Sequence, residues 1–280
     1  MAIANPSTPD VRGISDDIRM TWNGKAFAAL RRGGELAAFF ILVIVALEAF
    51  IVLAGVEPYI FPAPSAIGRA LWRGLIDGSY LSALAVTMTE ILGGLALGAL
   101  LGISLGVAMV NVSLLERFLY PCIVALQTVP KVAIAPLMII WFGFGLQSKI
   151  FMVTVMCLFP CLINTIAGLR ATDSDRINLI RAMRGSRWQI LRYVQLPSAA
   201  PYIMAGINTA VVLAIIGAIV GEFVGAKVGI GVLILKANFE LALDVAFSLI
   251  VLLAITGVIL STTIKAIERR LCFWSGRATK

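Results

Sequence analysis

Apolar residues gather in six long runs along the chain, and short polar segments separate these runs. Each run approaches or exceeds the ~20 residues that an α-helix needs to cross the hydrocarbon of a bilayer. The runs cover residues 36–55, 82–110, 118–142, 150–169, 202–224 and 245–267. The pattern predicts an all-α membrane protein with about six transmembrane helices.

Composition supports this class. Hydrophobic residues make up 60% of the 280 residues, charged residues make up 14%, and the mean hydropathy is +0.98. A chain this apolar is typical of polytopic membrane proteins. The net charge is +8, and the Lys and Arg residues responsible for it cluster beside the apolar runs. No polar domain is predicted that could present these residues to a nucleic acid, so a role in membrane topology is favoured over nucleic-acid binding.

Basic residues accumulate on one side of the predicted spans. That side holds Arg12, Arg19, Lys25, Arg31, Arg32, Arg117, Arg170, Arg176, Arg181, Arg184, Arg187, Arg192, Lys265, Arg269, Arg270, Arg277 and Lys280. The other side holds Arg69, Arg73, Lys149, Lys227 and Lys236. Because cytoplasmic loops are enriched in Lys and Arg, both termini are expected in the cytoplasm. The expected organisation is a cytoplasmic segment 1–35, a transmembrane domain 36–270 with a cytoplasmic loop 170–200, and a cytoplasmic tail 271–280.

Glycines repeat every four residues in two of the runs. Gly94, Gly98, Gly102 and Gly106 form one series, and Gly217, Gly221 and Gly225 form the other. A helix face without side chains lets a neighbouring backbone approach closely. We therefore expect the second and fifth spans to be central.

Several kinds of chemistry lack their usual residues. The chain has no His, and no Gly-rich loop ending in Lys-Ser or Lys-Thr is present. Cys157 and Cys161 are one helical turn apart, but small buried side chains are a better interpretation than a metal site, because no carboxylate lies nearby in sequence. No catalytic residues, metal ligands or cofactor are predicted in this chain.

Ionisable and polar groups inside the runs indicate contact with protein or with a water-filled path, because a charge facing lipid costs at least ~2.5 kcal/mol. For Lys131 the alternatives are a solute path that attracts an anion, an ion pair with Glu90 or Glu222, or snorkelling toward the interface. For Glu222 they are gating and a hydrogen bond to the following Gly-rich loop. Glu48 is a further group of this kind. The candidate pathway residues are Glu90, Gln127, Thr128, Lys131 and Glu222.

The Arg-rich segment between the fourth and fifth runs predicts two short helices exposed to water. The first covers 176–183, with Ile177, Leu179, Ile180 and Met183 as apolar contacts. Gly185 and Ser186 break it, Ser186 caps a second helix over 187–194, and Pro197 closes that helix. Such an element suits the docking of a soluble partner.

This segment resembles the cytoplasmic signature loop of the permease subunits of binding-protein-dependent ABC importers. The usual pattern is Glu-Ala-Ala, three residues, Gly, nine residues, Ile, any residue, Leu-Pro. Here Asn178 takes the Glu position, Arg184 the Gly position with Gly185 one place later, and Val194 the Ile position. In that family the loop docks into a cleft of an ATP-hydrolysing subunit. The resemblance implies that the residues of this chain that dock to the ATPase are Arg176, Asn178, Arg181, Ala182, Arg184, Gly185, Ser186, Arg187, Trp188, Leu196 and Pro197.

Similarity covers most of residues 60–270. Residues 62–65, 136–143, 164–170 and 221–223 are similar to the branch that imports nitrate, sulfonates, taurine, bicarbonate or pyrimidine-type vitamin precursors. The resemblance implies the type I importer permease fold, alternating access and a place in the bacterial inner membrane. It also implies four kinds of partner: ABC ATPases that use ATP and magnesium, a periplasmic or lipid-anchored solute-binding protein, a second copy of the chain in a homodimer, and membrane lipids.

Two other transport classes and one enzyme class stay open at this point. A secondary transporter would show two related halves, a channel subunit would need a filter-like segment, and a membrane enzyme would need clustered nucleophiles, acids or metal ligands. None of these patterns is convincing in the sequence.

Overall fold

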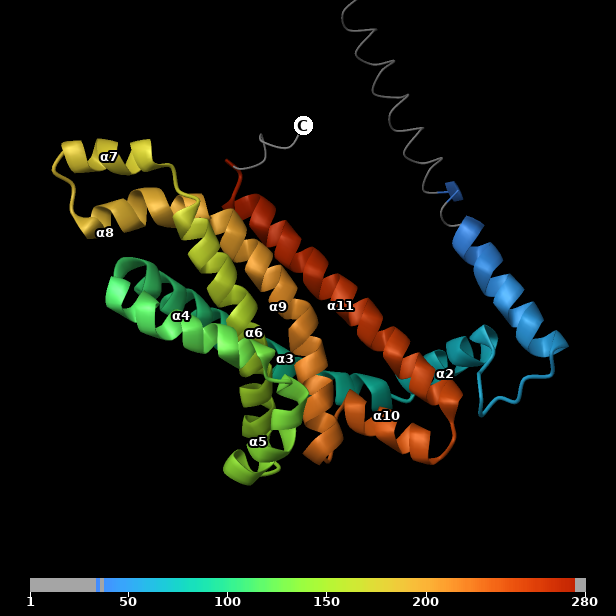
Figure 1. Ribbon diagram of the computed structural model, residues 1–280. Coiled ribbons are helices and arrows are strands. Elements are labelled where there is room, and N and C mark those ends of the chain that lie inside the picture. The colour runs from blue at the N-terminus through green and yellow to red at the C-terminus, as the bar shows by residue number, and fades with distance from the viewer. Residues whose placement is uncertain (1–33, 36–37, 275–280) are drawn as a thin grey trace, which may run out of the picture. The chain divides into compact units, whose positions relative to one another are not determined.

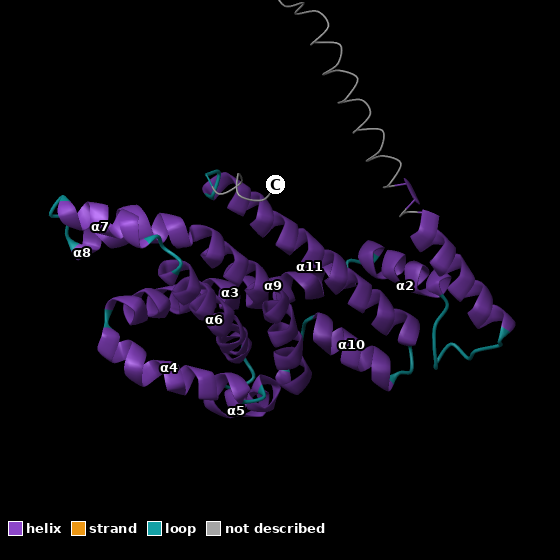
Figure 2. Cartoon of the chain, turned by 45° about the horizontal axis from the view of Figure 1, so that its top comes forward, coloured by secondary structure: helices purple, strands orange, loops and turns teal. Residues whose placement is uncertain are grey.

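The computed structural model describes residues 34–35 and 38–274. Most of the predicted N-terminal segment 1–35 and part of the tail 271–280 lie outside the described residues. Among the described residues, all regular secondary structure is helical (Figure 2). The chain divides into two compact units, Met1–Ser65 and Ala66–Lys280, which are described separately.

The first unit contains the apolar helix Ala38–Leu53, which falls within the first predicted span. Its Glu48 accepts two hydrogen bonds from Ser65, one from the backbone N–H at 2.9 Å and one from the hydroxyl at 2.7 Å. Ser65 is the second residue of α2 (Pro64–Ile76), whose first N–H groups have no partner within the helix. Glu48 therefore has a partner within the protein, and its carboxylate caps the start of α2.

The second unit consists of helices joined by short connections (Figure 1). They are α3 (Ser79–Asn111), α4 (Ser113–Thr128), η1 (Lys131–Ile134), α5 (Ala135–Phe142), α6 (Leu146–Arg170), α7 (Ser174–Ala182), α8 (Arg187–Ile190), η2 (Leu191–Gln195), α9 (Leu196–Gly225), α10 (Ile230–Phe239) and α11 (Leu243–Leu271).

Four helices among the described residues are long and apolar enough to cross a membrane. They are Ser79–Asn111, Leu146–Arg170, Arg187–Gly225 and Leu243–Leu271. The runs predicted at 82–110, 150–169, 202–224 and 245–267 fall within them. The described residues thus hold four such spans, or up to five when a bent pair is included, where the hydrophobic pattern predicts six.

The predicted span 118–142 corresponds to the bent pair. Helices Ser113–Thr128 and Lys131–Phe142 meet at 89°. Val129 and Pro130 between them are extended, with ψ angles of 127° and 100°. Proline has no backbone N–H and disfavours a helical conformation in the residue before it, so the helix ends at Thr128.

The core of the second unit lies where α3, α6 and α9 pack together. A Cβ atom at Gly98 would lie 2.6 Å from Cys157 Cβ, and one at Gly217 would lie 3.2 Å from Val153 Cα. Both glycine faces thus allow close packing, as expected, and α6 is the helix they both contact. Cys157 and Cys161 are fully buried among the apolar side chains of these three helices, so they act as small core residues.

Candidate functional site

The predicted docking segment lies at one end of the second unit, beyond the ends of α6 and α9 (Figure 1). We call residues 174–190, which hold α7 and α8, the α7–α8 tip. Asp173 starts α7, because its carboxylate accepts a hydrogen bond from the backbone N–H of Asp175 at 2.9 Å. This is the usual way in which an Asp caps a helix.

The end of α7 is fixed by two backbone hydrogen bonds of the Schellman type. The N–H of Gly185 bonds to the carbonyl of Ile180 and that of Arg184 to the carbonyl of Arg181, both at 2.9 Å. Arg184 has φ 57°, the left-handed conformation that glycine usually supplies at this place. Gly185 is required for a different reason, since a Cβ atom there would lie 2.9 Å from the carbonyl oxygen of Ile180.

A capping box starts α8. The N–H of Gln189 donates to the hydroxyl of Ser186 at 3.3 Å, and the N–H of Ser186 donates to the side-chain oxygen of Gln189 at 2.7 Å. The prediction that Ser186 caps the second helix is confirmed.

The prediction that Pro197 closes this helix is wrong. The Leu196 N–H bonds to the carbonyl of Leu191, five residues back, and this wider turn leads directly into α9. Pro197 is the second residue of α9 and follows this wider turn directly, so the helix accommodates the proline at the point where its hydrogen-bond pattern changes. Residues Arg187–Gly225 therefore form one nearly continuous helix of 39 residues that joins the tip to the core.

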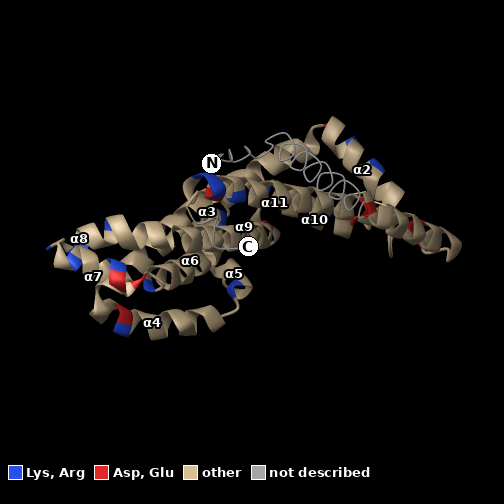
Figure 3. Ribbon diagram, turned by 90° about the horizontal axis from the view of Figure 1, so that it is seen from above, with Lys and Arg blue, Asp and Glu red and all other residues tan. Residues whose placement is uncertain are grey.

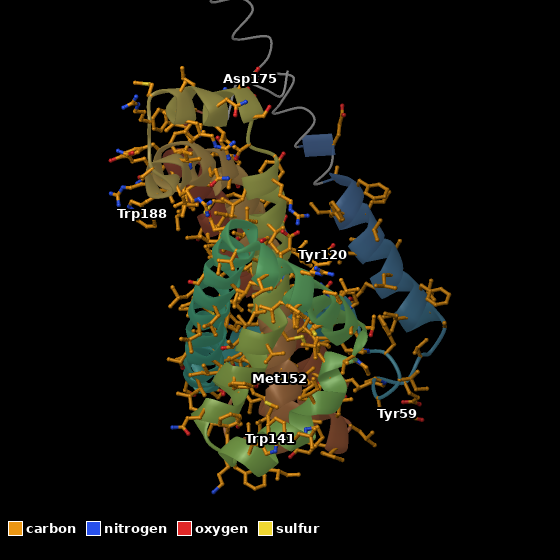
Figure 4. All side chains as sticks on the ribbon, turned by 60° about the vertical axis from the view of Figure 1, so that its left-hand side comes forward. Tyr59, Tyr120, Trp141, Met152, Asp175 and Trp188 are labelled. Carbon is orange, nitrogen blue, oxygen red and sulfur yellow. The ribbon has the colours of Figure 1, made fainter. Side chains whose placement is uncertain are left out.

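The surface of the α7–α8 tip combines apolar and basic side chains. Leu179, Met183 and Trp188 are 61%, 73% and 63% exposed. Ile177 and Ile180 are half-buried, so only these two of the four expected apolar contacts are covered within the chain. The remaining candidate residues at the tip surface are exposed: Arg176, Asn178, Arg181, Ala182, Arg184 and Arg187. Figure 3 shows basic residues along α7 and α8, and Figure 4 shows Trp188 at this end and Trp141 at the opposite end.

A groove of about 710 Å³ adjoins the tip. Asp173, Arg176 and Tyr193 line it from the loop side, and Trp274 lines it from the turn that follows α11. Nearby, the carboxylate of Glu116 at the start of α4 forms an ion pair with Arg170 at the end of α6. The base of the tip is therefore tied to the neighbouring helices.

Gln127, Thr128 and Lys131 lie together at the bend between α4 and η1. Gln127 and Lys131 are half-buried and Thr128 is exposed. The ammonium group of Lys131 lies 5.1 Å from the centre of the Phe159 ring on α6, which is a cation–π contact. Among the described residues, no ion pair joins Lys131 to Glu90 or Glu222.

Glu90 and Glu222 belong to a separate buried cluster, and each is 1% exposed. The carboxylate of Glu222 on α9 accepts hydrogen bonds from the Thr87 hydroxyl on α3, at 2.6 Å, and from the Gly231 N–H on α10. The N–H of Ile230 donates to the same Thr87 hydroxyl at 3.0 Å. The hydrogen bond from Glu222 to the Gly-rich loop is thus confirmed, and it holds the start of α10.

Lys149 is the cation of this cluster, a role that the sequence does not reveal. It is 6% exposed, and its ammonium group donates to the carbonyls of Phe144 and Gly145 at 3.1 and 3.3 Å. A Cβ atom at Gly221, the residue before Glu222, would lie 3.2 Å from the Lys149 side chain, so the lysine packs beside the start of this cluster. The charge pattern predicts Lys149 in an outer connection because it begins an apolar run. Thr87 leaves a clearer signal, since it precedes Glu90 by one helical turn.

Residues 94–272 match the family model described as binding-protein-dependent transport system inner membrane component. The chain is 34% identical to the riboflavin transport system permease protein of Chloroflexus aurantiacus, over 85% of this chain and 89% of that one. It is 32% identical to the formylaminopyrimidine transport permease protein of Halalkalibacterium halodurans, over 86% and 95%. It is 30% identical to the taurine transport system permease protein of Escherichia coli, over 79% and 82%.

Two solved structures share the fold. An inward-facing structure of the MetNI methionine ABC transporter matches 69% of this chain and 94% of its own, with a TM-score of 0.58 and 22% identity. A crystal structure of an amino acid ABC transporter with histidines matches 72% and 96%, with a TM-score of 0.56 and 13% identity.

Proposed function

Since this chain belongs to the family of binding-protein-dependent transport system inner membrane components, we propose that its α7–α8 tip couples a separate ABC ATPase to solute movement. Family membership makes it a multi-pass transport permease. The finer proposal concerns the coupling and the solute. The observation that carries it is the exposed surface of Leu179, Met183 and Trp188 among arginines, at the end of a helix that runs into the core.

The tip is suited to transmit a displacement. Asp173 and the Ser186–Gln189 capping box fix the starts of its two helices, and the bonds to Ile180 and Arg181 fix the end of α7. A rigid element moves as one body when a partner displaces it. Because α8 continues into α9, such a displacement reaches the α3–α6–α9 core directly. ATP and magnesium act in the partner ATPase, and this chain contributes the conformational step.

Arg181 and Arg184 supply the charged contacts in this proposal. Asn178 stands where the family pattern has Glu, so this chain cannot form the ion pair that an acidic residue would form there. Exposed arginines at the centre of an interface recognise carboxylates with paired hydrogen bonds. We therefore expect acidic side chains in the facing cleft of the ATPase.

The complete importer in this proposal lies in a bacterial inner membrane. Two copies of the chain form a homodimer around the pathway, two ATPases bind the tips, and a solute-binding protein, periplasmic or lipid-anchored, delivers the cargo. The solute is a small nutrient of the nitrate, sulfonate, taurine or pyrimidine and aromatic classes, which includes the kinds of solute named for the relatives.

Lys131, with Gln127 and Thr128, is proposed to line the solute path at the bend. A half-buried ammonium group held against an aromatic ring attracts an anionic or electron-rich solute. Lys131→Met should lower the rate of uptake in whole-cell assays while the level of assembled complex stays unchanged. Lys236→Met, at an exposed ion pair on α10, is the matched control. Equal losses of uptake and assembly in Lys131→Met would indicate a structural role instead.

Crosslinking tests the coupling proposal. A photoreactive amino acid replaces Trp188 in one variant and Phe239, 85% exposed at the end of α10, in another, with the complex in native membranes. We expect a crosslink to the ATPase from position 188 and none from position 239. A functional complex without a crosslink at 188, or uptake that proceeds without the ATPase, would contradict coupling through the tip and favour a secondary transporter or channel.

A further inference from the structure

The two buried carboxyl groups of the Glu90–Glu222 cluster differ in their surroundings. Both oxygens of Glu222 accept hydrogen bonds, one from the Thr87 hydroxyl and the other from the Gly231 N–H. These donors lie at the first residues of α10 and on α3, and helix N-termini favour negative charge. Glu222 is therefore placed as the ionised member.

Glu90 lacks comparable partners. Its Oε2 atom is buried and has no hydrogen-bond partner. An ionised carboxylate with a buried oxygen that accepts no hydrogen bond is strongly disfavoured, because the hydration that it loses on burial is not replaced by any hydrogen bond. The carbonyl oxygen of a neutral carboxyl group tolerates the same position at lower cost.

Glu90 lies one helical turn after Thr87, whose hydroxyl donates to Glu222, so the two carboxyl groups share one buried space between α3 and α9. Two ionised carboxylates side by side in such a space repel each other, whereas a protonated one can donate a hydrogen bond to its ionised neighbour. The geometry thus supplies an acceptor for a proton on Glu90.

Among the described residues, Lys149 of α6 is the charged group that packs beside this pair. The groups that α3 and α10 contribute beside the two glutamates, the Thr87 hydroxyl and the N–H groups of Ile230 and Gly231, are neutral. Two ionised glutamates with one ammonium would leave a net negative charge in the core. A single proton on the pair makes the cluster neutral.

We propose that Glu90 and Glu222 bind one proton between them, carried on Glu90 and donated to Glu222, at the junction of α3, α9 and α10. This proton keeps Glu222 available as the anionic cap of α10. This buried site binds a proton, and its residues lie apart from the α7–α8 tip. The proposal is therefore independent of ATPase coupling.

Infrared spectroscopy of the full-length chain in lipid nanodiscs tests the proposal at neutral pH. The carbonyl stretch of a protonated carboxyl group, on the high-frequency side of the amide I band, should be present and should shift slightly in D₂O. It should vanish in Glu90→Gln and persist in Glu240→Gln, an exposed control that is ion-paired with Lys236. Absence of the band in the unmodified chain, its survival in Glu90→Gln, or its appearance only after sodium and potassium are replaced by choline would overturn the proposal.

Thermal unfolding gives a second readout. The amide of Gln can donate to Glu222 as the protonated carboxyl does, so Glu90→Gln should keep an apparent Tm close to that of the unmodified chain. Glu90→Ala removes the donor and leaves a cavity, so its Tm should fall. A fall in Glu90→Gln as large as in Glu90→Ala would show that the charge of Glu90 is needed, which contradicts a proton there.

Discussion

Replacing Gly102 with Ala should weaken the packing of α3 against α6. A Cβ atom at this position would lie 2.6 Å from the carbonyl oxygen of Leu158, 2.9 Å from Cys161 Cβ and 3.0 Å from the Leu162 nitrogen. Two of these atoms belong to the backbone of α6, so no flexible side-chain end can move aside. The helices must separate to admit the methyl group.

The size of the effect follows from these distances. Non-bonded carbon atoms are most stable at separations of about 3.5–4.0 Å, so the helices must move apart by about 1 Å. Overpacking of this kind costs about 1–3 kcal/mol, and the backbone clash places Gly102→Ala near the middle, at about 2 kcal/mol. Gly93→Ala is the matched control, because its Cβ would lie 3.3 Å from the flexible end of Ile150. The better helix propensity of Ala and the small shift required of Ile150 oppose each other, so we expect this change to alter the stability by less than about 0.5 kcal/mol.

Thermal unfolding of the purified chain in detergent, followed by tryptophan fluorescence, compares the two variants. Gly102→Ala should unfold at a clearly lower temperature than both the unmodified chain and Gly93→Ala. Equal unfolding temperatures for the two variants would refute the inference that the α3–α6 contact has no room for a side chain.

Two predictions concern the caps of the α7–α8 tip. Arg184→Gly should stabilise the end of α7 by about 1 kcal/mol, because a left-handed conformation penalises a side chain, whereas Arg181→Gly inside the helix should destabilise it by about 1 kcal/mol. Hydrogen exchange of the α7 amides should therefore slow in the first variant and quicken in the second, and the same direction in both would contradict the cap. Ser186→Ala should cost about 1 kcal/mol and quicken exchange at Gln189, whereas Ser174→Ala, beside the true cap, should not. An unchanged rate at Gln189 would show that the capping box is dispensable.

Hydrophobic patterning predicts α3, α6, α9 and α11 well, because each exceeds the thickness of a bilayer and carries few charges. At the third run this patterning does not predict the bend, because the average hydropathy of a window carries no information on the direction of the helix axis. Pro130 is the signal for the 89° bend, and it outweighs the apolar character of 118–142.

The tip shows what local rules can and cannot predict. Ser186 is identifiable as a cap because its side chain acts within three residues of sequence. Pro197 has two opposite local meanings, the end of one helix or the first turn of the next, and the π-helical turn before it decides between them.

The polar residues of the spans depend on the three-dimensional fold. Glu48, Glu90 and Glu222 are expected to face protein or water, and the structure gives each a neighbour in the protein. Lys149 lies beside Glu90 and Glu222 only because α3, α6 and α9 converge. Its place in this cluster therefore cannot be predicted from spacing in the sequence. The same convergence separates Glu90 and Glu222 from Lys131 at the bend.

Solute-stimulated ATP hydrolysis by the reconstituted complex measures coupling through the α7–α8 tip itself. Ala182→Glu places a negative charge on the exposed α7 surface that is proposed to meet acidic groups of the ATPase. Asn238→Glu places the same charge on an exposed residue of α10, at the opposite end of the second unit. Ala182→Glu should lose the stimulation by solute, whereas Asn238→Glu should retain it. Full stimulation in a folded Ala182→Glu complex would contradict coupling through the α7–α8 tip.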